Sequence, residues 1–270
     1  MEKEFFVERY RKLGWKFYKP KIKQAIRVNT LKISKDRLKK RLSAKGIKVS
    51  DIGFSKDGLF VEKSDFSIGS TVEYLLGYCY TQGSASQLPA EMLNPAQDDL
   101  VLDCCAAPGG KTTQLSQLMK NKGVIIALDK KSQRLIALKN NIERMGCSNV
   151  IAYNIDALDV SSLSLKFNKI LLDAPCSGNF TQDENWFGKR DIEGIKGNAE
   201  NQKKLLKACF DVLMPGGILV YSTCSLEPEE NEDNVGWFLE NFNAKLLEKK
   251  MLWPSEESQG FFIAKFMRKK

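Results

Sequence analysis

The segment 99-DLVLDCCAAPGGKTTQLSQLMK-120 decides the fold class. It begins with a short apolar run that predicts a buried strand, continues through a glycine-rich turn, and ends in a stretch with helical periodicity. A strand that leads directly into a helix is the repeating unit of α/β folds. The segment therefore predicts the first strand and the first helix of such a fold.

The same succession of strand and helix continues toward the C-terminus. Unbroken apolar strands between amphipathic helices indicate a parallel sheet that is covered by helices on both faces. We expect a last helix in the region of 227–242 and a strand at 261–268 to add antiparallel edges. The predicted strands are 99–104, 123–129, 149–156, 168–175 and 216–224, and the predicted helices are 111–120, 131–145 and about 200–214.

The chain before this sheet has a mixed pattern. Residues 25–31 alternate like a strand, 34–46 have a Ser start, helical periodicity and a Gly stop, and 58–63 form a short apolar run. These features predict a small α+β unit. We therefore divide the chain into residues 1–80 and residues 81–270.

The positive charge is concentrated at the N-terminus. Residues 1–50 contain 17 Lys or Arg against 4 Asp or Glu, which gives this part a net charge of +13. The whole chain has a net charge of +9, so the remaining residues sum to −4. Cations beside aromatic rings can neutralise phosphates and offer stacking faces, which is typical of a nucleic-acid-binding arm. A solvated basic helix is the alternative. The rings in question are Phe5, Phe6, Tyr10, Trp15, Phe17 and Tyr18.

Two residue types limit the chemistry. The seven cysteines are odd in number and have no CxxC spacing, and histidine is absent. This argues against a disulfide framework and against a zinc site, so we expect no bound metal. Without histidine, neither a Ser-His-Asp triad nor a Cys-His pair can form.

Nothing in the sequence predicts contact with a membrane. Runs such as 123–129 and 216–221 are far shorter than the roughly 20 apolar residues that a membrane helix needs. The first residues, MEKEFFVERYRK, lack a signal-peptide pattern. We therefore expect a cytoplasmic protein.

The loop 103-DCCAAPGGKTTQL-115 predicts a ligand site. Its adjacent glycines let a ligand approach the backbone, and the helix that follows offers free amide donors. It resembles a phosphate-binding Walker loop but has Cys105 where that motif needs glycine, which disfavours a nucleoside triphosphatase. The alternative ligand carries a carboxylate and a ribose.

Acidic residues end three successive strands. Asp129, Asp156 and Asp173 each place a carboxylate where it can bind sugar hydroxyls or an amine, as acidic residues do in dinucleotide-binding folds. Each could instead cap the helix that follows it. Three such ends in succession favour the ligand-binding interpretation.

Two cysteines are predicted at the same edge of the sheet. Cys176 follows the fourth strand in 173-DAPCSG-178, and Cys224 follows the fifth in 221-YSTCSLEPEEN-231. A cysteine is often only a small buried hydrophobic residue. Here both lie beside turn-forming residues at strand ends, where side chains line pockets.

The motifs CAAPGGKT, LLDAPCSG and YSTCSLEPEEN, in this order and preceded by RVNTLK at 27–32, carry a resemblance. The chain resembles the Nop2/Sun (Fmu-type) family of RNA cytosine-5 methyltransferases, most closely the short archaeal tRNA enzymes. The resemblance covers nearly the whole chain. It implies a Rossmann-like class I methyltransferase fold with a small N-terminal α+β RNA-binding unit, S-adenosylmethionine as cofactor, and RNA, expected to be tRNA, as substrate.

The resemblance also implies residue roles. Cys224 would attack carbon 6 of cytosine, which makes carbon 5 nucleophilic, and Cys176 would assist release of the methylated base. Asp173 and Lys111 would contact the cytosine ring. Independently of the resemblance, a helix predicted to begin near Ser225 and the positive charge of Lys111 would both lower the pKa of Cys224. S-adenosylmethionine would be held by Cys105, Ala106, Ala107, Pro108, Gly109, Gly110, Lys111, Asp129, Arg134, Asp156 and Asp173.

Several alternatives stay open. Spacing alone does not choose between the two thiols, since DNA cytosine methyltransferases attack from a Pro-Cys motif. A methyltransferase for exocyclic amines needs an (Asp/Asn)-Pro-Pro-aromatic pocket, and 173-DAPC-176 lacks the second proline and the aromatic residue. Ribosomal RNA as substrate, or a catalytically silent RNA-binding protein on this scaffold, are the remaining alternatives.

Overall fold

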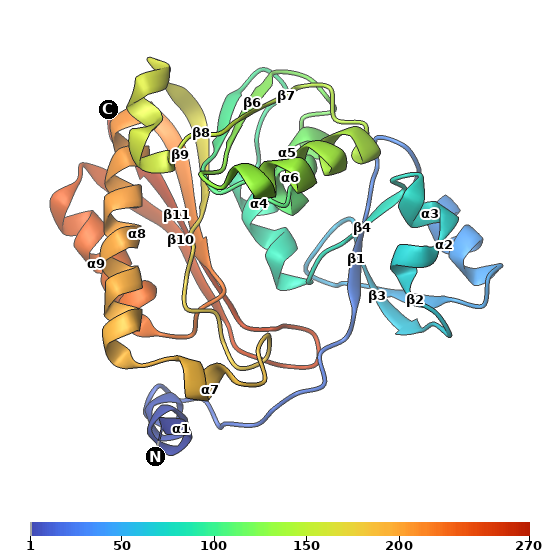
Figure 1. Ribbon diagram of the computed structural model, residues 1–270. Helices are drawn as coiled ribbons and strands as arrows, with labels where there is room; N and C mark the ends of the chain where they lie inside the picture. The colour runs from blue at the N-terminus through green and yellow to red at the C-terminus, as the bar shows by residue number, and fades with distance from the viewer. Residues whose placement is uncertain (1) are drawn as a thin grey trace.

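Two sheets organise the chain in the computed structural model, which describes residues 2–270 (Figure 1). In the larger sheet the strands follow the order β10-β11-β9-β8-β5-β6-β7, and β5 to β9 run parallel to one another. The predicted parallel sheet is therefore confirmed. The strands are β5 (Leu100–Asp103), β6 (Val124–Leu128), β7 (Val150–Tyr153), β8 (Phe167–Asp173), β9 (Leu213–Thr223), β10 (Ala244–Leu252) and β11 (Phe261–Arg268).

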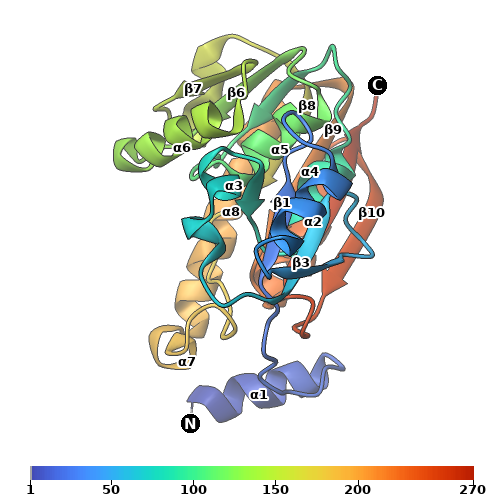
Figure 2. The ribbon, with the colours of Figure 1, turned by 90° about the vertical axis from the view of Figure 1, so that its right-hand side faces the viewer.

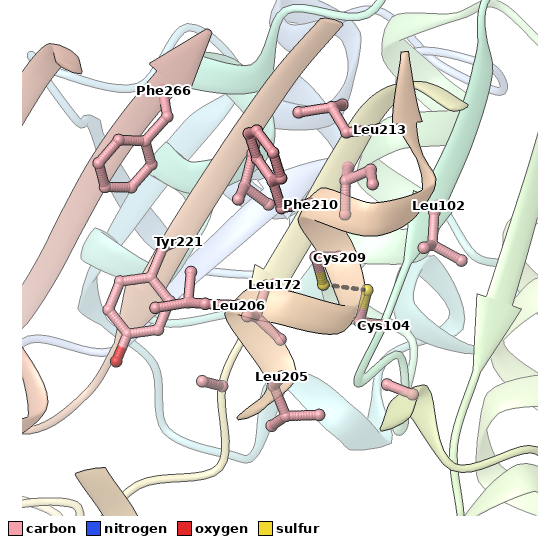
Figure 3. Close-up of a cluster of buried hydrophobic side chains, with 14 of the residues drawn as sticks. Leu102, Cys104, Leu172, Leu205, Leu206, Cys209, Phe210, Leu213, Tyr221 and Phe266 are labelled. Atoms are coloured by element: carbon pink, nitrogen blue, oxygen red, sulfur yellow. Dashed lines mark hydrogen bonds between the residues drawn. The ribbon is translucent and has the colours of Figure 1, made fainter. Parts of the chain in front are cut away.

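Helices cover both faces of this sheet, because its strands are apolar on both sides. Leu102 and Leu172 point to the face that α8 and α9 cover (Figure 3). Val101 and Leu171 point to the opposite face, which α4, α5 and α6 cover. The covering helices are α4 (Leu88–Leu93), α5 (Gly110–Leu118), α6 (Ser132–Met145), α8 (Ile192–Val212) and α9 (Glu232–Asn241), together with the 3₁₀ segment η3 (Ala157–Leu163).

The antiparallel edge differs from the prediction. Strand β11 is antiparallel to β9, as expected, but it lies inside the sheet because β10 pairs with its other side. The sequence of β10, AKLLEKKML, has an exposed charged stretch, Glu248 to Lys250, which hid the strand from an analysis of apolar runs. Charged side chains of this kind are common on edge strands, where they discourage pairing with other molecules.

The smaller sheet has the order β2-β3-β1-β4 and is antiparallel. Helix α2 packs Leu38 and Leu42 against Ile26 and Leu59 of this sheet. The predicted α+β unit is therefore present, although β2 and β4 were too short and mixed to predict. Its elements are β1 (Ala25–Val28), α2 (Lys35–Ser43), β2 (Lys48–Asp51), β3 (Gly58–Lys63), η1 (Ile68–Ser70), α3 (Val72–Leu75) and β4 (Cys79–Thr81), followed by η2 (Ala85–Gln87).

The N-terminal helix α1 (Glu2–Lys12) does not belong to this unit. It packs beside α7 (Trp186–Lys189), below the larger sheet, and an extended segment leads from it to β1 (Figures 1 and 2). Phe6, Tyr10 and Trp15 are buried there, so the prediction that they offer stacking faces is wrong. They pack against an apolar surface that includes Phe180, Trp186 and Leu226, which the sequence pattern did not indicate.

No helix within residues 2–270 combines the length and the apolar character that crossing a membrane requires.

Candidate active site

The carboxyl ends of the parallel strands meet at one edge of the larger sheet, as in other open α/β sheets. A cavity of about 460 Å³ opens there. It brings together predicted site residues from five strand ends, although these are far apart in the sequence. The predicted residues that line it are Cys105, Ala107, Asp129, Arg134, Asp156, Asp173, Cys176 and Cys224.

A second hollow of about 220 Å³ adjoins this cavity, and both are bordered by Cys105, Ala107 and Asp173. The remaining residues of the predicted cofactor loop border the second hollow, with one exception. Gly109 lines neither hollow, because it faces α6, where an added Cβ would lie 3.0 Å from Leu138. The loop residues at the second hollow are Ala106, Pro108, Gly110 and Lys111.

Glycine is needed in the loop for its backbone conformation. Gly109 has φ of +107°, in the region that other residues rarely adopt, and it is the N-cap of α5. No side chain of the described residues caps the helix there, so amides of the first turn stay available to a ligand. The loop is fixed to the sheet because the Ala106 amide donates to the Leu128 carbonyl at 2.8 Å.

The acidic residues differ in their surroundings. Asp129 accepts from the Lys131 amide at 2.9 Å and pairs with Arg134 at 3.3 Å, while Arg134 also donates to the Ala107 carbonyl. Arg134 thus connects Asp129 to the cofactor loop. Asp156 accepts from the Leu158 amide at 3.1 Å and caps η3, so the capping interpretation holds for this residue although it also lines the cavity.

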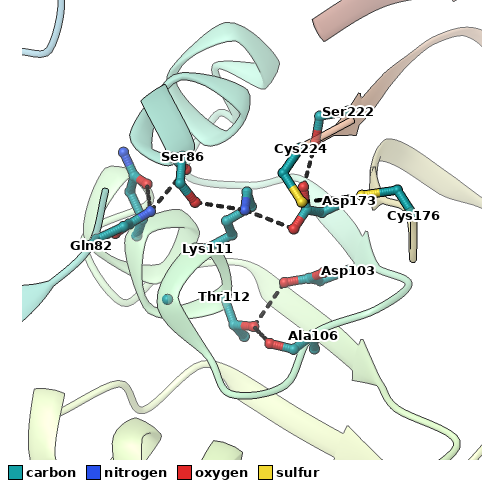
Figure 4. Close-up of polar contacts among 12 residues, drawn as sticks. Gln82, Ser86, Asp103, Ala106, Lys111, Thr112, Asp173, Cys176, Ser222 and Cys224 are labelled. Atoms are coloured by element: carbon teal, nitrogen blue, oxygen red, sulfur yellow. Dashed lines mark hydrogen bonds and ion pairs between the residues drawn. The ribbon is translucent and has the colours of Figure 1, made fainter. Parts of the chain in front are cut away.

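Lys111 and Asp173 form an ion pair beside the thiols (Figure 4). Lys111 Nζ lies 2.7 Å from Asp173 Oδ2 and 2.8 Å from Ser86 Oγ. Ser222 donates its hydroxyl to Asp173 Oδ1 at 2.7 Å, so both carboxylate oxygens are held. The pair therefore presents a fixed arrangement of one positive and one negative group.

Two loops carry the two thiols: the β8 loop (residues 174–179) and the β9 loop (residues 224–231). Cys176 Sγ lies 3.1 Å from Cys224 Sγ. The hydrogen bond with Cys176 lowers the pKa of Cys224, and the positive charge of Lys111 acts in the same direction against the cost of burial. The same hydrogen bond, together with burial, raises the pKa of Cys176. Cys224 is the thiol that ionises first.

The predicted helix at Ser225 is wrong. The chain after Cys224 first forms the 3₁₀ turn η4 (Pro228–Glu230), and α9 begins only at Glu232. The predicted helix N-terminus is therefore not present at Ser225, and the groups that lower the Cys224 pKa are its neighbours Cys176 and Lys111.

Two buried charged residues that border the second hollow or its loop were not predicted as site residues from the sequence. Asp103, at the end of β5, accepts from Thr112 Oγ1 at 2.7 Å and lines the second hollow, and burial raises its pKa to about 7. Arg27 of β1 donates to the Gly110 carbonyl at 2.5 Å and to Thr113 Oγ1 at 2.8 Å, which joins the smaller unit to α5. Burial lowers the Arg27 pKa to about 10. Two features of the sequence could have indicated these residues: Asp103 is a fourth acidic residue at a strand end, and Arg27 is the charged residue that begins RVNTLK.

Two family models match the chain. The model of the 16S rRNA methyltransferase RsmB/F matches residues 90–267, and the model of the N-terminal domain of 16S rRNA methyltransferase RsmF matches residues 3–84. The match to residues 3–84 covers most of α1 and the smaller sheet, and the match to residues 90–267 covers the larger sheet.

The names of similar proteins specify different RNA substrates. The chain is 36% identical to ribosomal RNA small subunit methyltransferase F of Vibrio parahaemolyticus, over 92% of this chain and 57% of that protein. It is 36% identical to tRNA (cytosine(49)-C(5))-methyltransferase of Pyrococcus abyssi, over 91% of this chain and 81% of that protein. The crystal structure of NSun6 from Pyrococcus horikoshii with SFG matches with a TM-score of 0.86 and 28% identity, over 93% and 92%. The chain thus spans little more than half of the first relative.

Proposed function

The chain belongs to the RsmB/F family, the Nop2/Sun-type methyltransferases that its motifs resemble, and from this premise we propose that it methylates carbon 5 of cytosine in RNA. The observation that carries the proposal is the pair of thiols 3.1 Å apart at the edge of the ligand cavity. A methyltransferase for an exocyclic amine has no use for two thiols in this place.

The cavity fits S-adenosylmethionine as the cofactor. Its volume lies within the roughly 300–1,000 Å³ of small-molecule sites, and its wall offers carboxylates for a ribose diol and an amine. Asp129 and Asp156 would hold the ribose and the adenine, while Cys105 and Ala107 of the loop would line the cofactor. When bound, this cofactor supplies an electrophilic methyl group. SFG, which accompanies the NSun6 structure, is an analogue of it.

Cys224 would act as the nucleophile. Its thiolate would add to carbon 6 of the cytosine. This addition raises the electron density at carbon 5, which is otherwise too weak a nucleophile to accept a methyl group. Lys111 and Asp173 would contact the N3 and N4 edge of the base and orient it. Reaching this site requires the cytosine to leave its stack, as other enzymes that modify bases require.

Cys176 would assist the release of the product. After methylation, carbon 5 must lose its proton before the bond between Cys224 Sγ and carbon 6 breaks. Cys176 Sγ lies 3.1 Å from Cys224 Sγ, and the hydrogen bond that raises the Cys176 pKa is lost once Cys224 is bonded to the base. Cys176, after losing its own proton to solvent, would accept the proton from carbon 5. The electrons of that C–H bond would form the double bond between carbons 5 and 6 while Cys224 leaves as a thiolate.

The RNA would be tRNA, held in part by the basic N-terminal region of residues 1–80. The local charge of +13 in residues 1–50 supports binding of phosphates. Ion pairs reduce it locally, because Lys35 and Lys39 contact Asp51 and two further cations contact Glu73. Ribosomal RNA is the second candidate because of the relative from Vibrio parahaemolyticus. A cytoplasmic location stays a prediction from the sequence.

The test is transfer of a labelled methyl group from S-adenosylmethionine to unmodified tRNA and to small-subunit rRNA, with bisulfite sequencing of both products. We expect protected cytosines in tRNA and none with the Cys224→Ala protein. Methylation of rRNA alone would keep the reaction and overturn the substrate. Strong RNA binding without transfer to either would support the catalytically silent alternative.

A further inference from the structure

Helix α1 lies beneath the two loops that carry the thiols. Its apolar side enters an aromatic cluster, defined here as Phe6, Tyr10, Trp15, Phe180 and Trp186, all buried. The first three rings come from the N-terminal segment, and the last two come from the segment that follows the β8 loop. The cluster therefore joins the N-terminus to the catalytic part of the chain.

The N-terminal segment holds the β9 loop through Glu227, three residues after Cys224. Tyr10 donates its hydroxyl to Glu227 Oε1 at 2.8 Å, and Arg9 Nε donates to Oε2 at 2.8 Å. Glu227 is fully buried, and Arg9 also pairs with Glu229. A buried carboxylate that loses these partners would be costly, so the contacts fix the loop.

The aromatic cluster holds the β8 loop as well. Trp186 donates its indole N–H to the Ser177 carbonyl at 2.9 Å, immediately after Cys176. Phe6 of α1 packs on Trp186 with ring centroids 4.8 Å apart. A displacement of α1 would therefore be transmitted to both loops.

The two loops are also bonded to each other. Asn179 donates to the Cys224 carbonyl at 2.7 Å, and the hydroxyls of Ser177 and Ser225 lie 3.1 Å apart. Glu230 accepts from the Ser177 amide at 2.9 Å. The separation of the thiols is thus set by a network that rests on the aromatic cluster.

We propose that α1 is a positioning element of the active site: through Glu227 and the aromatic cluster it fixes Cys224 against Cys176 and so sets the reactivity of Cys224. The consequence for methylation rests on the proposed function, while the effect on the thiol does not. The charged and titratable groups that face Cys224 are Cys176, Asp173, Lys111 and Glu230. In this proposal, α1 contributes none of these groups but fixes their positions relative to Cys224.

The test is alkylation of the free protein by iodoacetamide across a range of pH, with the Cys224 peptide followed by mass spectrometry. In Tyr10→Phe and Arg9→Gln proteins, we expect the apparent pKa of Cys224 to rise and alkylation near pH 7 to slow about three- to tenfold. Arg9→Lys should restore part of the rate. Glu8→Gln, which removes an exposed partner of Arg11 on the same helix, should have no effect.

Methylation separates this role from a role in gripping RNA. If the proposed function holds, Tyr10→Phe should lower kcat and leave KM for RNA unchanged. A raised KM with unchanged alkylation would overturn the proposal and make α1 an RNA-binding arm. Unchanged alkylation in both Tyr10→Phe and Arg9→Gln would overturn it too. Because alkylation needs neither RNA nor cofactor, a protein without methylation activity would still test α1.

Discussion

The β8 loop and the β9 loop present the same chemical group at the same edge of the sheet, yet their thiols are shifted in opposite directions. The hydrogen bond with Cys224 and burial raise the pKa of Cys176, and the nearby carboxylate of Glu230 acts in the same direction. Cys224 receives that hydrogen bond and the charge of Lys111, so its pKa is lowered. The neighbours of each thiol, and not the residue type or the strand end, set the direction of its pKa shift, and this difference supports the proposed roles of nucleophile and helper.

Removal of the proposed nucleophile should have the largest effect and tests the difference between the two thiols most severely. Cys224→Ala should reduce methyl transfer by on the order of 10⁴-fold or more, because the thiolate that the proposed mechanism needs for addition to carbon 6 is gone. Cys147→Ala, which removes a thiol outside the site, should leave transfer near normal. Substantial transfer by the Cys224→Ala protein would contradict the assignment of the β9 loop.

Removal of the other thiol should arrest the reaction at a different step. Cys176→Ala should lower turnover by about 10²- to 10³-fold while a protein–RNA adduct that resists denaturation accumulates, because attack proceeds and release does not. Gel electrophoresis in denaturant measures the adduct. The double Cys176→Ala/Cys224→Ala protein should show none, and an adduct there would point to a third nucleophile.

The charge beside Cys224 is the next test of the difference. Lys111→Met should raise the pKa of Cys224 and lower turnover by about 10²-fold, since a positive charge near the thiolate and the base is lost. Lys122→Met, an exposed lysine just beyond the same helix, is the matched control. An equal loss of turnover in both proteins would show that the effect comes from the lower net charge of the protein and not from the position of Lys111.

The smallest effect is in the pH dependence of the thiols alone. Because its pKa is lowered, Cys224 should be alkylated half-maximally below the roughly pH 8.5 of an ordinary cysteine. Cys176→Ala should move this midpoint upward, since the hydrogen-bond donor is gone. A midpoint that stays in place would show that Lys111 acts without help from Cys176.

The edge of the larger sheet that carries the candidate site was predictable because its determinants are local. Apolar runs placed the parallel strands, and parallel topology then requires Cys176 and Cys224 to share an edge although 48 positions separate them. Asp129, Asp156 and Asp173 follow from the same reasoning. The hydrogen bond between the thiols, which is the largest cause of their opposite pKa shifts, was not predictable, because it depends on how close the β8 loop and the β9 loop bring the two sulfurs.

Other features depend on tertiary packing that no local pattern records. Phe6 and Tyr10 read as exposed stacking rings in a basic helix, but a surface on the catalytic part of the chain buries them. The acidic run after Cys224 reads as the start of a helix, but Asn231, with φ of −118° and ψ of −94°, separates η4 from α9. Arg27 is buried because its partners belong to α5.

The most direct test of the account is the site of attachment in the trapped adduct. Cys176→Ala protein is incubated with RNA and S-adenosylmethionine, digested with protease and nuclease, and the linked peptide is sequenced by tandem mass spectrometry. The account predicts a methylated cytidine on Cys224 in the β9 loop. Attachment to another residue, or methylated cytosine formed without any attached intermediate, would contradict it.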